Sequence, residues 1–302
     1  MANGSGAATV IDISEENGFI LYDRIQKIRS VITKYGEENF YLAFSGGKDS
    51  TCLSALVDMA VPQNKIPRVY INTGIELNMI ADFVKLSAKH DERVVIISPS
   101  VPIKPTLERV GYPFKSKAHS HMCDRYRRIS SCPSVQSYLG NGKWPRSMCC
   151  PKMLKYQFEE GFELKISDRC CVEMKEKPLE RWSREYNKPY ALIGIMPDEG
   201  GRRKNATCLR FRGRKLAAFQ PLTVVDKKWE DWFINEYHIK ICELYTHYGQ
   251  LRSGCKGCPF SLHLQEELDM LEKYFPSERR QCEIIWEPVY AEYRRLGYRL
   301  KK

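Results

Sequence analysis

A six-residue segment, Ser45-Gly46-Gly47-Lys48-Asp49-Ser50, constrains this sequence more than any other feature. It follows a short apolar run at 39–44, which predicts a buried strand, and it precedes the helical pattern STCLSALVDMA. The two glycines permit close approach of the backbone, and amide groups at the start of the next helix can then bind phosphate oxygens. The lysine adds positive charge, and the two serines add hydroxyl donors. The segment is not a Walker A loop, but it predicts a phosphate-binding loop of another kind.

Helices and strands alternate on both sides of this loop. Apolar residues of 16–36 recur at steps of three and four, which predicts an amphipathic helix that ends near Gly36. The pattern continues with a strand at 68–72, a helix at 78–90 and a strand at 93–98. Such alternation is typical of an α/β fold, so we expect a parallel sheet with helices on both faces.

The remainder of the chain divides into segments of different character. Residues 99–150 are rich in Pro, Gly, Ser and basic residues, and we interpret them as a basic insertion of loop and short helices. A strand is predicted at 190–195, a strand and turn at 217–225, and a helix capped by Asp226 after that. We therefore expect a loose tail at 1–15, a nucleotide-binding domain at 16–253, and a helical segment at 254–302.

The charge balance favours a polyanionic partner. The 302 residues contain 48 Lys and Arg against 37 Asp and Glu, a net charge of +11. Nucleic acid or a nucleotide fits such a surface, although a basic surface can also serve only to keep a protein soluble. No apolar run approaches the ~20 residues that span a bilayer, and no signal peptide is evident. We expect a cytoplasmic protein with no membrane partner.

Twelve cysteines are many for a chain without an export signal, and close spacing in such chains favours metal binding over disulfides. Two features stand out: the tandem Cys170-Cys171, and Cys255-x-x-Cys258 after a gap of 83 residues. Four thiolates can hold a [4Fe–4S] cluster or Zn²⁺. Neighbouring thiolates suit a cluster better, because each can bind a different iron. A second tandem, Cys149-Cys150, could substitute for one of these ligands or relay sulfur.

These motifs resemble those of a known family. The segment 45–50 resembles the PP-loop of adenine nucleotide alpha hydrolases, and the CC…CxxC pattern with CCVEMKEKP is similar to that of iron–sulfur sulfonucleotide reductases. The chain is therefore identified as a member of the phosphoadenosine phosphosulfate (PAPS) reductase family, on its cluster-bearing branch. The resemblance implies a Rossmann-like sheet with a nucleotide at the carboxyl ends of the strands.

The resemblance also implies site residues. ATP, or alternatively adenylyl sulfate or PAPS, would bind at loop 45–50 with help from Thr73, Gly74, Gly194, Arg202 and Arg203. Lys48 and Asp49 are the catalytic candidates. Mg²⁺ is a further expectation, although Asn72 stands where many relatives carry an Asp. The cluster ligands would be Cys170, Cys171, Cys255 and Cys258.

One departure keeps several functions open. Sulfonucleotide reductases carry a catalytic cysteine in an ECGxH-like tail, and this sequence lacks that motif, which leaves Cys282 or Cys123 for the role. The first hypothesis is ATP-dependent sulfur transfer to a nucleic acid bound along the basic, aromatic stretch 115–146. The others are a reductase that releases sulfite and a non-enzymatic nucleotide or redox sensor. A sulfur or electron donor protein is an expected partner.

Overall fold

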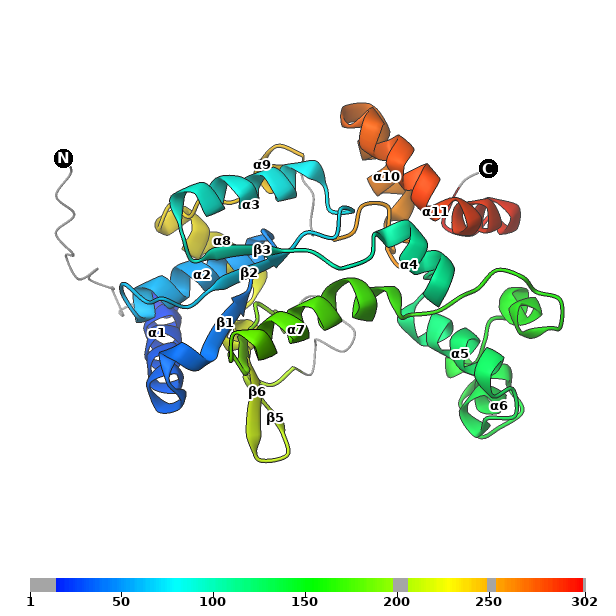
Figure 1. Ribbon diagram of the computed structural model, residues 1–302, viewed down its shortest axis with the longest axis horizontal. Helices are drawn as coiled ribbons and strands as arrows, with labels where there is room; N and C mark the ends of the chain where they lie inside the picture. Colours follow the sequence, from blue (N-terminus) through cyan, green and yellow to red (C-terminus); the bar gives the residue numbers. More distant parts are fainter. Residues whose placement is uncertain (1–14, 198–205, 249–253, 301–302) are drawn as a thin grey trace. The chain divides into compact units, whose positions relative to one another are not determined.

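The computed structural model describes residues 15–197, 206–248 and 254–300 (Figure 1). The chain forms two compact units. We call the first the sheet unit, which comprises Met1–Tyr70, Asn78–Ile97 and Arg181–Ser253. The second is the cysteine unit, which comprises Ile71–Leu77, Ser98–Glu180 and Gly254–Lys302. The predicted insertion at 99–150 and the predicted helical segment at 254–302 thus belong to the same unit. Residues 1–14 of the predicted tail lie outside the described residues.

The sheet unit is built on six strands in the order β3-β2-β1-β4-β6-β5. Their bounds are β1 Phe40–Ala43, β2 Arg68–Ile71, β3 Val94–Ile97, β4 Tyr190–Leu192, β5 Leu209–Arg212 and β6 Lys215–Phe219. β1 pairs in parallel with β2 and β4, and β4 with β6. The predicted α/β fold is confirmed.

One edge of the sheet differs from the prediction. β5 runs antiparallel to β6 because a two-residue turn at Gly213 and Arg214 returns the chain directly. Gly213 has φ +61°, as the first residue of a tight hairpin turn often does. The sheet is therefore mostly rather than wholly parallel.

Five helices accompany the sheet: α1 Glu16–Tyr35, α2 Lys48–Ala60, α3 Asn78–His90, α8 Lys227–Glu236 and α9 Glu243–Thr246. α2 packs against both α1 and α8, and α3 packs against β3. The N-terminus of α8 forms as predicted, since the Asp226 side chain accepts a hydrogen bond from Trp229 N at 2.8 Å. Tyr41 of β1 packs on Trp182 of α7 (Lys177–Glu185), so the neighbouring Phe40 and Leu42 point to the opposite face.

The cysteine unit is mainly helical. Its helices are α4 Ile103–Val110, α5 Lys117–Arg128, α6 Pro133–Leu139, α10 Leu264–Tyr274 and α11 Pro276–Leu296. Short 3₁₀ turns at Arg146–Met148 and Lys152–Phe158 follow α6, and a π-helical turn at Val172–Glu176 leads into α7. The predictions of short helices in 99–150 and of a helical region after 254 are both confirmed. Among the described residues, no helix is long and apolar enough to cross a membrane.

Candidate functional site

The loop between β1 and α2 is held closed by its own serines. Ser45 Oγ accepts from Gly47 N at 3.2 Å, and Ser50 Oγ donates to Gly47 O at 3.0 Å and accepts from Ser45 N at 3.2 Å. Gly46, at φ +69°, makes the turn. The two hydroxyls that the sequence offers as phosphate donors therefore also shape the loop.

The loop leaves backbone amide groups available at the start of α2. Gly47 is the N-cap, and no side chain of the described residues caps this helix of 13 residues. The first amide groups of an α-helix have no partner within the helix and carry part of its positive dipole. The N-terminus of α2 is therefore suited to bind phosphate, as predicted for residues 45–50.

Two glycines are required by the packing of this loop. A Cβ atom on Gly46 would lie 2.6 Å from Val84 Cγ2. A Cβ atom on Gly194 would lie 2.8 Å from Asp49 O and 3.0 Å from Asp49 C. The residue that follows β4 by two positions thus touches the first turn of α2. The structure brings Gly194 and the loop together, as the sequence analysis expected.

The Lys48 ammonium lies beside two carboxylates that no sequence pattern indicates. Its Nζ lies 2.7 Å from Asp231 Oδ1 and 2.9 Å from Glu230 Oε2, both in α8. Burial opposes the lysine charge, but the hydrogen bonds and charges of these carboxylates outweigh it and raise the pKa of Lys48. Burial and the neighbouring Asp49 charge raise the pKa of Glu230 to about 7. Some 180 residues separate these groups in sequence, and no local pattern links them.

A cavity of about 630 Å³ lies beside the loop. Lys48 and Asp49 form one wall, and residues from the end of α8 to the start of α9, among them Asn235, His238 and Lys240, form another. This volume is within the usual range of small-molecule pockets. His238 adopts φ +48°, an uncommon conformation for a residue other than glycine.

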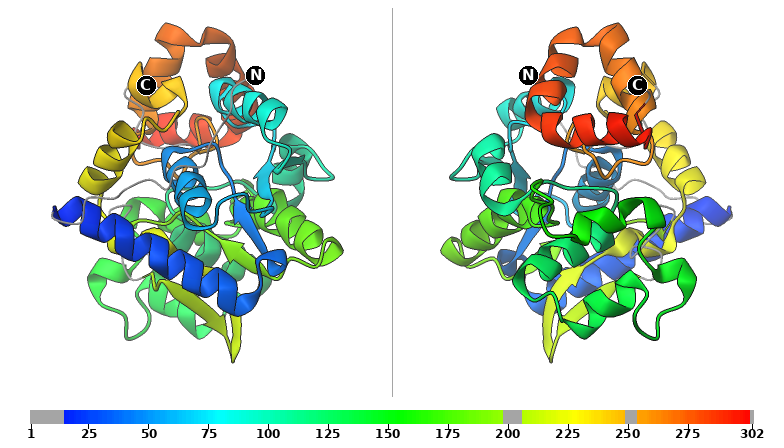
Figure 2. Two further views of the ribbon diagram at one scale, coloured as in Figure 1. Left: turned by 90° about the vertical axis from the view of Figure 1, so that its left-hand side faces the viewer. Right: turned by 90° about the vertical axis from the view of Figure 1, so that its right-hand side faces the viewer.

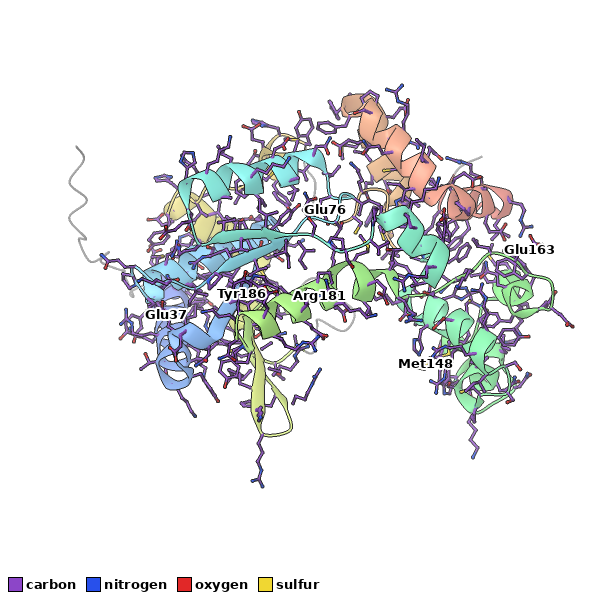
Figure 3. All side chains as sticks on the ribbon, in the orientation of Figure 1. Glu37, Glu76, Met148, Glu163, Arg181 and Tyr186 are labelled. Carbon is purple, nitrogen blue, oxygen red and sulfur yellow. The ribbon has the colours of Figure 1, made fainter. Side chains whose placement is uncertain are left out.

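Thr73 and Gly74, also predicted to bind the nucleotide, belong to the cysteine unit. The hydroxyl of Thr73 donates to Glu76 Oε1 at 2.8 Å, and the Thr73 amide donates to Glu76 Oε2 at 3.0 Å. The Asn72 side chain accepts from Gly74 N at 3.1 Å. These bonds fold the segment after β2 into a turn around the buried Glu76 carboxylate, which is labelled in Figure 3. Arg202 and Arg203 lie outside the described residues.

The turn around Glu76 pairs with the CxxC segment. Glu76 and Cys255 form an isolated antiparallel bridge, and Lys256 N donates to Ile75 O at 2.8 Å. Lys175, from the π-helical turn, places its Nζ 3.3 Å from Glu76 Oε1. The turn therefore joins Cys255 to the segment that follows Cys171.

Helix α11 holds the CxxC segment from the other side. Trp286 Nε1 donates to Lys256 O at 3.0 Å, Tyr290 Oη donates to Gly257 O, and Tyr293 Oη donates to Pro259 O at 2.9 Å. The three aromatic residues recur at steps of four and three, so they share one face of the helix. Lys256 forms a buried ion pair with Glu278 at 3.0 Å. Buried carbonyls with matched donors fix this backbone firmly.

The four predicted cluster cysteines lie in the cysteine unit and influence one another. The thiols of Cys170 and Cys171 are 4.0 Å apart. The hydrogen bond from Cys170 lowers the pKa of Cys171 to about 6, with help from Lys117 and Lys175 against burial. Burial raises the pKa of Cys255 to about 11, and it raises that of Cys258 as well. The charge of Cys171 acts on both of these thiols.

The competing cysteines occupy other surroundings. Cys149 Sγ contacts the carbonyl oxygens of Ser137 and Pro145 at 3.5 Å, and Cys150 N donates to Tyr138 O at 2.7 Å. The second tandem thus packs against α6. Cys282 and Cys123, the candidates for a catalytic thiol, are 0% and 3% exposed. Burial raises the pKa of both, that of Cys282 to about 12.

The described residues contain no preformed site for a single metal ion. Within residues 15–197, 206–248 and 254–300, no three His, Cys, Asp or Glu side chains are arranged to hold one metal ion. The assignment of the four cysteines therefore depends on their chemistry and on their position in one unit.

Known proteins resemble this chain in sequence. The sequence model described as the phosphoadenosine phosphosulfate reductase domain matches residues 146–297, half of the chain. An uncharacterized protein of Methanocaldococcus jannaschii is 24% identical over 257 residues, which are 80% of this chain and 49% of that protein. The chain therefore spans about half the length of this curated relative.

Solved structures with some likeness include two of different activities. PAPS reductase from Candida auris, in a phosphate complex, is 12% identical with a TM-score of 0.43, over 76% of this chain and 93% of that one. The U34-tRNA thiolase of Methanococcus maripaludis, solved with its [4Fe–4S] cluster, is 17% identical with a TM-score of 0.38, over 93% and 80%.

Proposed function

Because this chain belongs to the phosphoadenosine phosphosulfate reductase domain family, we propose that it is an enzyme of sulfur transfer. In this proposal ATP binds at loop 45–50 and activates an oxygen of a nucleic-acid acceptor, which then receives sulfur. The observation that carries the proposal is the burial of Cys282 and Cys123. A reductase needs an accessible thiolate to attack sulfur, and burial keeps both of these thiols neutral.

The nucleotide step uses groups at the start of α2. An acceptor oxygen attacks the α-phosphorus of ATP, the bond to the β-phosphate oxygen breaks, and pyrophosphate leaves. The amide groups of α2 and the Lys48 ammonium stabilise negative charge on the phosphates. Mg²⁺ is commonly held by one or two carboxylates and the substrate phosphates, and Asp49 is the carboxylate of the loop. A sulfur nucleophile from a donor protein then displaces AMP from the acceptor.

In this proposal, four cysteines of the cysteine unit hold a [4Fe–4S] cluster. Cys170, Cys171, Cys255 and Cys258 would each bind one iron. Such a cluster, when bound, supplies redox or sulfur-carrying chemistry. Lys175 contributes a positive charge near Cys171 and Cys255, and it forms an ion pair with Glu76. The hydrogen bonds from α11 hold the backbone carbonyls of Lys256 and Gly257, which lie between Cys255 and Cys258.

The test compares the products formed from ATP with those formed from adenylyl sulfate or PAPS. Protein purified without oxygen is assayed for iron and sulfide and then incubated with ATP and nucleic acid. We expect AMP and pyrophosphate from the native chain, and a loss of at least about 100-fold in Lys48→Ala. Lys65→Ala, which removes an exposed lysine of the same unit, should leave turnover unchanged.

Two outcomes would reject the proposal. Sulfite release from adenylyl sulfate or PAPS with a thiol donor, without AMP formation from ATP, would identify a reductase. Binding of ATP without turnover, with affinity that changes on oxidation, would identify a sensor.

A further inference from the structure

The hairpin of β5 and β6 carries an unusual concentration of positive charge. Arg210, Arg212, Arg214 and Lys215 are all exposed, and Phe211 between them is 48% exposed. In the part of the chain that the structure describes, none of the four cationic side chains forms an ion pair or hydrogen bond. The sequence from 200 to 225 contains no Asp or Glu. Within the described residues, these charges therefore have no acidic partner.

The geometry of the hairpin works against its own stability. Arg212 lies directly opposite Lys215 across the two strands. Like charges in directly opposed positions destabilise an antiparallel pair. A hairpin that served only to close the sheet would gain from an acidic residue at either position. The retained repulsion points to an anionic partner that neutralises both charges.

Protection of a sheet edge does not account for the pattern. β5 is the last strand of the sheet, and charged residues commonly prevent such edges from pairing with another chain. One or two charges of either sign are sufficient for that purpose. Here four charges of one sign surround the turn, and Figures 1 and 2 show the hairpin extending away from the other strands of the sheet unit.

We propose that the β5–β6 hairpin binds duplex DNA by entering the major groove, with its cations on the flanking phosphates. The major groove of B-DNA is about 12 Å wide and admits a two-stranded ribbon. The deep, narrow major groove of A-form RNA does not admit one. The inference rests on the proposed function for the role of this DNA as the acceptor. The binding itself needs neither ATP nor a cluster.

The test measures DNA binding alone. Fluorescence anisotropy of a labelled duplex of about 20 base pairs is recorded without ATP over a range of salt concentrations. The variant Arg210→Gln/Arg212→Gln/Arg214→Gln should bind at least about tenfold more weakly at ~0.1 M salt. Its slope of log affinity against log salt should be smaller by about 2 to 3, because each lost phosphate contact removes about 0.9.

A matched control distinguishes the effect of the hairpin surface on DNA affinity from the effect of a lower net charge. Lys27→Gln/Lys65→Gln/Lys89→Gln removes three exposed lysines from the same unit, and it should change affinity by less than about twofold. Equal losses in both triple variants, or no loss in the first, would overturn the proposal. Equal binding of duplex RNA with the same dependence on the hairpin would also overturn it. A single cooperative thermal transition, at or above the native midpoint, confirms that each variant is folded.

Failure of this inference is distinguishable from failure of the proposed function. DNA binding through the hairpin without AMP formation would reject the function and leave the hairpin proposal intact. AMP formation with a nucleic acid, together with native DNA binding by the hairpin variant, would do the reverse.

Discussion

Glu230 is 1% exposed, and its carboxyl group lies between the charges of Lys48 and Asp49. Lys48 and Glu230 differ in how their protonation depends on pH. Lys48 keeps its charge, because Asp231 and Glu230 both favour the ammonium form. Glu230 keeps its proton to about pH 7, because burial and Asp49 outweigh the lysine. A nucleotide phosphate that binds Lys48 would therefore compete with Asp231 and, above about pH 7, with the Glu230 carboxylate as well.

This arrangement predicts a pH dependence of stability. The pKa of Glu230 lies above the usual value of a glutamic acid, so the folded chain holds a proton that the unfolded chain has lost. Its contribution is present at low pH and is lost as pH rises through about 7. Relative to Glu230→Gln, the native chain should lose up to about 3 kcal/mol between pH 5 and 8. Urea unfolding across this range measures the difference. Glu236→Gln, at an exposed position of the same helix, is the control.

Gly194 gives a second prediction at this scale. In Gly194→Ala the new methyl group would displace the first turn of α2 from its position at Asp49. We expect ATP to bind at least about tenfold more weakly, because small displacements of phosphate-binding amides weaken several hydrogen bonds together. Calorimetric titration measures the change. Gly254→Ala, where a Cβ atom meets nothing within 4 Å, should bind ATP normally. Normal binding by Gly194→Ala would show that the loop tolerates the shift.

The residues of the candidate site differ in how well sequence patterns predict them. The loop 45–50 was predictable because its specificity is local: two glycines, a lysine and two serines lie between a strand and a helix. Glu230 was not, because its role depends on how α8 packs against α2, which no short-range pattern encodes. Thr73 stays a predicted nucleotide contact, and its hydrogen bond to Glu76, three residues later, was not predicted.

Helix α11 provides the clearest case of one element supporting another. Its aromatic residues donate to three carbonyl groups of the CxxC segment, and its Glu278 pairs with Lys256. Gly257 has φ +60°, and a Cβ atom there would lie 2.4 Å from Tyr290 Oη. The loop and the helix are therefore matched to each other.

Removal of one hydroxyl group tests this support. Tyr290→Phe leaves the carbonyl of Gly257 buried without a donor, which should cost about 1–3 kcal/mol of unfolding free energy. We also expect less iron and sulfide per chain after anaerobic purification. Tyr22→Phe, at an exposed position of α1, is the control for both measurements. Native stability in Tyr290→Phe would show that water satisfies the carbonyl.

At the level of elements, the predicted order of helices and strands is confirmed from α1 to β3. The antiparallel strand β5 was missed because its Arg-rich sequence lacks the apolar alternation of a half-buried strand. The π-helical turn after Cys171 was also missed, since its sequence does not differ from that of an ordinary helix. Such turns are frequent at functional sites, and this one places Lys175 beside Glu76.

Each unit is built from three separate stretches of sequence, because the chain passes from one unit to the other five times. The proposed nucleotide loop belongs to one unit, and the four proposed cluster ligands belong to the other. Each ligand should therefore stabilise its own unit first. Hydrogen exchange should show added protection with ATP in α2 and β1. Removal of the cluster should release protection in 98–180 and 254–300 and leave the sheet unchanged.

Two outcomes would contradict this separation. Loss of sheet protection when the cluster is removed would show that the units unfold as one. Protection of α11 by ATP alone would show the same from the other side. Lys48→Ala serves as the control, because it should remove the effect of ATP and keep the effect of the cluster.

The match between the CxxC segment and α11 has a consequence for the order of biosynthesis. Between Cys171 and Cys255 the ribosome adds 83 residues, and the helix that supports the CxxC segment follows later still. Chains are made from the N-terminus at about 5–20 residues per second, and early segments fold first. Cys170 and Cys171 are therefore made several seconds before the CxxC segment and α11. If the chain holds the proposed cluster, iron delivered during translation would meet an incomplete set of ligands, and the cluster would assemble only after α11 is released.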